Sequence, residues 1–178
     1  MNPKIFALLV FMVSVVMIFG SLSSAYLVKK SDGDWIFIDF PVMFQYTSII
    51  IVLSSISMHW AYLSTKKNDL EKVKLGLLVT GILALLFTGG QYLGWQELIQ
   101  DGHHFAADHP AGSFIYVFTG LHIAHLGGGL LYLGIVLYNV FQFKVHSMKR
   151  LKIELCTIYW HFLGGLWLYL YLFLISNN

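Results

Sequence analysis

The segment "SFIYVFTGLHIAHLGGGLLYLGIVLYNVF", Ser113–Phe141, decides what kind of fold this chain adopts. It contains no Asp, Glu, Lys or Arg, and its apolar residues form a continuous block rather than a stripe at helical spacing. A hydrocarbon core about 30 Å thick is crossed by about 20 helical residues. We therefore expect a transmembrane helix here, which places His122 and His125 inside a bilayer.

The composition of the whole chain also indicates a membrane protein. Of its 178 residues, 57% are hydrophobic and 11% are charged, against about 45–50% and about 25% in ordinary soluble domains. A net charge of +2 is too small to indicate nucleic-acid binding. The single cysteine, Cys156, excludes an internal disulfide and a multi-cysteine metal site, and its apolar surroundings favour a buried thiol.

Other segments of similar length and hydropathy predict an all-α polytopic membrane protein with one transmembrane domain, residues 1–178. The segments lack the alternation of barrel strands, and a helix satisfies its own backbone polar groups in lipid. The five expected spans are Ile5–Val28, Pro41–Ser64, Val73–Leu98, Ser113–Phe141 and Ile153–Ile175.

The distribution of Lys and Arg predicts the orientation of these spans. Only Lys29 and Lys30 fall on one side of the membrane. The positive-inside rule therefore places the N-terminus in the cytoplasm and the C-terminus in the periplasm. The basic residues assigned to the cytoplasmic side are Lys4, Lys66, Lys67, Lys72, Lys74, Lys144, Lys149, Arg150 and Lys152.

Four histidines fall within the spans, and an ionisable residue in a membrane needs a partner or a purpose. One interpretation is a b-type haem between two opposed imidazoles, supplied by His161 with either His125 or His59. The other is neutral imidazoles hydrogen-bonded across helix interfaces. His122 and His125 share one face of one helix and cannot oppose each other. We favour the second interpretation, and expect His122 and His125 to bond between helices.

Metal binding, proton transfer and solute transport are weaker alternatives. The loop residues His103, His104, Asp108 and His109 could bind copper or zinc, but they also suit a solvated turn. A proton pathway needs acidic or histidine side chains through the membrane, and the spans hold carboxylates only near their ends. An odd number of spans without an internal repeat disfavours a small transporter. We expect no catalytic, metal-binding or cofactor-binding residue in this chain.

Small and interfacial residues indicate how the helices pack. Glycines allow membrane helices to approach closely, and the polar and aromatic groups Gln91, Trp95 and Glu97 suit the end of a helix. The glycines expected to pack closely are Gly90, Gly94, Gly127, Gly128, Gly129, Gly164 and Gly165.

Two motifs resemble a known family. The run Thr119-Gly120-Leu121-His122-Ile123-Ala124-His125 is similar to a T-G-[FL]-H-x-x-H segment, and Tyr159-Trp160-His161-Phe162 with Trp167 is similar to Y-W-H-F…W. Gln91 ahead of Trp95 is a weaker match. Together they resemble subunit III of haem-copper oxidases, the cytochrome c and quinol oxidases, in its short five-helix bacterial form.

Three positions depart from that family's pattern. Val15 stands where a glutamate is usual, Gly94 where an acid commonly follows the glutamine, and Gly164 where an aspartate commonly follows Y-W-H-F. Any family role that depends on those carboxylates is therefore in question for this chain.

The resemblance implies a non-catalytic subunit of a terminal respiratory oxidase in a bacterial inner membrane. It implies packing beside oxidase subunit I and other oxidase subunits, bound phospholipid, and haems and coppers held by the partner subunits. It is compatible with a larger respiratory supercomplex, and with either cytochrome c or a quinol as electron donor. The residues expected to act in helix packing are His59, Gln91, Trp95, Glu97, His122, His125, Tyr159, Trp160 and His161.

Overall fold

The computed structural model describes residues 2–31, 35, 38, 40–101, 110–142 and 148–177. Those residues form helices and no strand, and each helix is long and apolar enough to cross a membrane. The all-α, five-span prediction is confirmed, and each predicted span lies inside one helix except that Pro41 caps α2 from outside. The helices are α1 Pro3–Lys30, α2 Val42–Lys66, α3 Leu70–Gln100, α4 Pro110–Phe141 and α5 Met148–Asn177.

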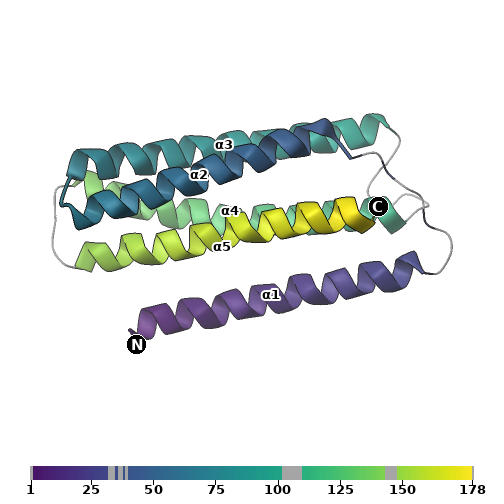
Figure 1. Ribbon diagram of the computed structural model, residues 1–178, viewed down its shortest axis with the longest axis horizontal. Helices are drawn as coiled ribbons and strands as arrows, with labels where there is room; N and C mark the ends of the chain where they lie inside the picture. Colours follow the sequence, from purple (N-terminus) through teal and green to yellow (C-terminus); the bar gives the residue numbers. More distant parts are fainter. Residues whose placement is uncertain are drawn as a thin grey trace.

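The helices run side by side with alternating direction, and the two termini lie at opposite ends of the molecule (Figure 1). The turn between α2 and α3 lies at the same end as the N-terminus. Lys66, Lys67 and Lys72 are therefore at that end, as the charge count requires. Helices α2 to α5 pack into a bundle, and α1 lies along its edge against α4 and α5.

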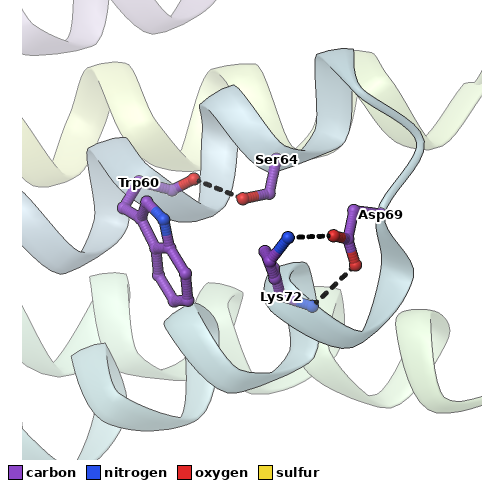
Figure 2. A network of polar contacts seen from close by, with 4 residues as sticks. All are labelled: Trp60, Ser64, Asp69 and Lys72. Atoms are coloured by element: carbon purple, nitrogen blue, oxygen red, sulfur yellow. Dashed lines mark hydrogen bonds and ion pairs between the residues drawn. The ribbon is translucent and has the colours of Figure 1, made fainter.

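Helix ends are fixed by local hydrogen bonds. The Asn2 side chain accepts a hydrogen bond from the Lys4 backbone N–H (3.1 Å) at the start of α1. Asp69 does the same for α3, accepting from the Lys72 N–H at 3.3 Å, and its carboxylate also lies 2.6 Å from Lys72 Nζ (Figure 2). Hydrogen bonds from the Lys72 side chain, and then from its backbone, lower the pKa of the Asp69 carboxyl.

A tight turn joins α2 to α3, and it depends on Asn68, the residue before the N-cap residue Asp69. Asn68 has a φ of 57°, a left-handed conformation that asparagine tolerates better than most residues. Just before the turn, the Ser64 hydroxyl donates to the Trp60 carbonyl at 2.9 Å (Figure 2). The chain thus reverses within a few residues, which sets α2 and α3 side by side.

Small residues bring α2 and α3 into close contact along their length. A Cβ built on Gly76 would lie 2.8 Å from Ala61 Cβ, and Cβ atoms on Gly90 and Gly94 would clash with Thr47 and Phe44. Glycine at these positions is required by the distance between the helices rather than by backbone conformation. This contact holds the polar side chains of α2 next to their partners on α3.

Candidate functional site

A row of serine and threonine side chains on α2 forms the polar centre of the bundle. Trp160 Nε1 of α5 donates to Ser54 Oγ at 3.0 Å, and Ser54 Oγ donates to the Thr80 carbonyl of α3 at 3.3 Å. Trp167 Nε1 donates to Ser48 Oγ at 2.9 Å. Both indoles are fully buried. Because lipid offers no hydrogen-bond partner, a buried indole N–H has to be satisfied inside the protein, and α2 supplies the acceptors.

Further hydrogen bonds join α3 to both of its neighbours. Gln91 Nε2 donates to Thr47 Oγ1 of α2 at 2.8 Å. One turn later, Trp95 Nε1 donates to Thr119 Oγ1 of α4 at 2.9 Å. Glu97 follows near the end of α3, where it is partly exposed. Gln91 and Trp95 therefore make contacts between helices rather than facing a cleft.

The structure brings His59 and His161 together. His161 Nε2 lies 3.4 Å from His59 Nδ1, and the ring centroids are 5.5 Å apart. The other nitrogen of His161 hydrogen-bonds the Ser55 hydroxyl. Two axial bonds of about 2.0–2.1 Å each would separate opposed nitrogens by about 4 Å. In this structure the facing nitrogens are closer than that and contact each other directly across the interface between α2 and α5.

His125 of α4 faces α1. Its ring contacts Phe11 and Phe19 of α1, with centroids 6.3 Å and 5.9 Å away. His125 Nδ1 lies 2.7 Å from the Leu121 carbonyl of its own helix. The expected hydrogen bond between helices is thus wrong for the His125 side chain. Its backbone carbonyl instead accepts a bond from Tyr159 Oη at 3.1 Å, which joins α4 to α5.

His122 is fully buried, and neither of its ring nitrogens has a hydrogen-bond partner among the described residues. The ring packs between Phe87 and Trp167, with centroids 5.9 Å and 5.3 Å away. The expectation of a hydrogen bond between helices is therefore wrong here too. The physical reason is that the nearest helix faces present aromatic rings, while the Trp167 N–H is already bound to Ser48.

The glycines divide into two groups. Gly90, Gly94 and Gly129 have a side chain within close contact of the Cβ position, and Gly164 has Ile51 and Ser55 at 3.9 Å.

In contrast, Gly127, Gly128 and Gly165 have no described atom within 4 Å of that position. The prediction of close packing within the chain is wrong for these three glycines. They face outward and line surface grooves, so their small size shapes the outside of the bundle.

The three positions without the family's carboxylates lie in the interior. Val15 is 1% exposed on the face of α1 that also carries Phe11 and Phe19. Gly94 lies against the Phe44 ring, and Gly164 lies against α2. Each lies where an unpaired carboxylate would be costly, so the apolar or small residues agree with their surroundings.

Metal binding finds no support in the part of the chain that the structure describes, where no group of three or more His, Cys, Asp or Glu residues lies together. The loop residues His103, His104, Asp108 and His109 lie outside the described residues.

The hydrogen-bond acceptors on α2 were not predicted from the sequence. Their signal is a spacing: Thr47 and Ser48 recur seven residues later as Ser54 and Ser55, which places all four on one face of a helix. That pattern, read beside the tryptophans of Ile153–Ile175, could have identified the polar row.

Comparisons with known proteins agree with the motifs. A sequence model of the family described as cytochrome c oxidase subunit III matches residues 37–176. Cytochrome bo(3) ubiquinol oxidase subunit 3 of Buchnera aphidicola subsp. Schizaphis graminum is 26% identical, over 99% of this chain and 95% of that protein. Cytochrome c oxidase subunit 3 of Thermostichus vulcanus is 27% identical, over 94% and 84%.

A third relative, cytochrome c oxidase subunit 3 of Bacillus sp. (strain PS3), is 26% identical over 86% of this chain and 76% of that protein. These matches extend over nearly the whole bundle and include both histidine motifs. With five helices of membrane-spanning length among its described residues and a family model that matches most of its length, the chain belongs to the cytochrome c oxidase subunit III family.

Proposed function

We propose that this chain is the accessory subunit III of a terminal haem-copper oxidase and that it stabilises the catalytic subunit I. The observation that carries the proposal is the family match over residues 37–176. The geometry supports a structural role, because Trp160, Trp167 and Gln91 direct their N–H groups to other helices of the same chain. The haems and coppers of the assembly belong to its other subunits, and their redox chemistry takes place there.

The proposal includes a location for the protein. The relatives from Buchnera and Bacillus are bacterial oxidase subunits, which supports a location in the bacterial inner membrane. Its lysine-rich end, with Lys66, Lys67 and Lys72, faces the cytoplasm, and its C-terminus faces the periplasm.

Phospholipid is the ligand that suits the outer surface. A groove of about 740 Å³ between α3 and α4 is lined by leucines, glycines, Ile82 and Ala124, which fit an acyl chain. A second groove of about 530 Å³ lies between α1, α4 and α5, with Lys4 beside Phe11 and Tyr132. The Lys4 ammonium supplies a positive charge for a lipid phosphate, while the aromatic side chains contact the hydrocarbon.

Purification of the affinity-tagged chain from its native membrane in mild detergent tests the proposed function. We expect haem-containing oxidase subunits in the same complex, together with oxygen consumption driven by cytochrome c or a quinol. A larger respiratory supercomplex would appear as additional cytochromes. A chain that migrates alone, or with proteins that lack haem and copper, would contradict the proposal.

A further inference from the structure

The surface between α2 and α5 contains a groove of about 500 Å³ that differs from the groove between α3 and α4. Most of its lining is apolar, as is usual for a lipid-facing surface. Three polar side chains interrupt that lining: Ser55 and His59 from α2, and His161 from α5. The groove between α3 and α4 is lined entirely by apolar residues and glycine.

The polar side chains lie at a depth where lipid could not satisfy them. His161 is near the middle of α5, and His59 is within the final third of α2. His161 is half-buried, bonded to Ser55 on one side and close to His59 on the other. His59 is exposed on the surface of the bundle. An exposed imidazole in hydrocarbon is costly because acyl chains neither donate nor accept a hydrogen bond.

The residues that line the groove are small in its centre and larger at its edge. Gly165 is exposed, with no described atom within 4 Å of its Cβ position, and Gly164 lies beside it against α2. Ile56 and Leu63, which are 60% and 42% exposed, form the rim. Small residues flanked by larger ones are how transmembrane helices approach closely. The groove thus allows another helix to approach closely and offers it a hydrogen-bonding group.

We propose that this groove receives a transmembrane helix of another oxidase subunit, which offers a hydrogen-bonding side chain to His59. The inference rests on the proposed function, since membership of an oxidase supplies the partner. Polar complementarity selects a protein helix over lipid as the occupant, because only a protein helix presents a fixed polar group at this depth. In this arrangement His161 and Ser55 hold the His59 ring toward the partner.

Filling the groove tests the proposal. In the tagged chain expressed in its native host, Gly165→Trp should cause loss of the oxidase subunits from the purified complex. Gly89→Trp is the matched control, because Gly89 is also an exposed glycine with open space around it and lies outside this groove. It should retain the partners, as should Gly165→Ala. Retention of the partners by Gly165→Trp would overturn the docking proposal.

A second measurement does not depend on blocking assembly. A photoreactive amino acid at position 56 should form an adduct with another oxidase subunit when the intact complex is irradiated. An adduct with lipid alone, or with a second copy of this chain, would overturn the proposal.

The hydrogen bond has its own test. His59→Leu should lower retention of the partners in detergent washes, and His59→Gln should restore part of it. Equal retention by both variants would contradict the hydrogen-bonding role.

The wild-type purification separates the two hypotheses. If the wild-type chain carries no oxidase subunits, the proposed function fails. If it carries them and Gly165→Trp carries them equally, only the docking site fails.

Discussion

His122 shows how a motif residue can be fixed in place without a hydrogen bond. Its ring is fully buried between Phe87 and Trp167, and both nitrogens lack a partner among the residues described. Burial of a polar group without a partner is unfavourable. The contribution of His122 to stability therefore comes from ring packing rather than from its nitrogens.

This leads to a prediction for two substitutions. His122→Phe should leave the melting temperature of the purified assembly unchanged or raise it, because it retains an aromatic ring and removes unpaired polar atoms. His122→Ala should lower stability by about 3–5 kcal/mol, the range for a cavity of aromatic size. Thermal unfolding in detergent measures both. A large loss with His122→Phe would show that a nitrogen of His122 binds something.

Val15 stands where the family usually has a glutamate, so a substitution there tests the effect of restoring that carboxylate. Val15 shares a face of α1 with Phe11 and Phe19, and both rings contact His125. Val15→Glu therefore brings a carboxylate toward the His125 imidazole.

We expect Val15→Glu to be tolerated when His125 is present. Combined with His125→Leu it should lower stability by about 3–5 kcal/mol, because the buried charge then lacks a partner. The melting temperatures of the two single variants and the double variant show whether the side chains at positions 15 and 125 interact. Additive effects would mean that the two side chains do not interact.

At the scale of the helix, the contact between α2 and α3 depends on glycine. Gly94 lies against the Phe44 ring and Gly90 against the Thr47 side chain. This proximity lets Gln91 reach Thr47 at 2.8 Å. Packing and hydrogen bonding between α2 and α3 therefore depend on the same short distance between the helices, and a wider separation would weaken both.

Replacement of the close glycine should separate the helices. Gly94→Ala should lower stability by about 1–3 kcal/mol, the usual cost of an overpacked core. Gly89→Ala is the control, because its Cβ meets no described atom within 4 Å. It should be neutral or stabilising by about 0.5–1 kcal/mol, since alanine favours a helix. Equal melting temperatures for the two variants would contradict the close contact.

At the scale of the whole molecule, the helices alternate in direction. The turn between α2 and α3, with Lys66, Lys67 and Lys72 near it, therefore lies at the same end as the N-terminus (Figure 1). Alkaline phosphatase fused after Asn178 should be active, because that enzyme requires the periplasm. The same enzyme fused within the turn at Asn68 should be inactive. The reverse pattern would show that the orientation given by the positive-inside rule is wrong.

Much of the fold could be predicted from the sequence. Each of the five helices is a long apolar segment, and in a membrane the backbone of such a segment has to satisfy its own hydrogen bonds. The motifs around His122 and Trp160 identified the family. Partners across helices were harder to predict, because two residues on different helices meet only when the rotation and depth of both helices are known.

The sequence by itself therefore determined the membrane spans, the family and which polar, aromatic and small side chains the bundle contains. Tertiary structure decided which of those groups meet. It paired Trp160 with Ser54 and His59 with His161, left His122 without a described partner, and turned Gly127, Gly128 and Gly165 outward. The physical reason is that hydrophobicity favours a position in the bilayer for each helix, whereas contacts depend on how side chains of different helices fit together.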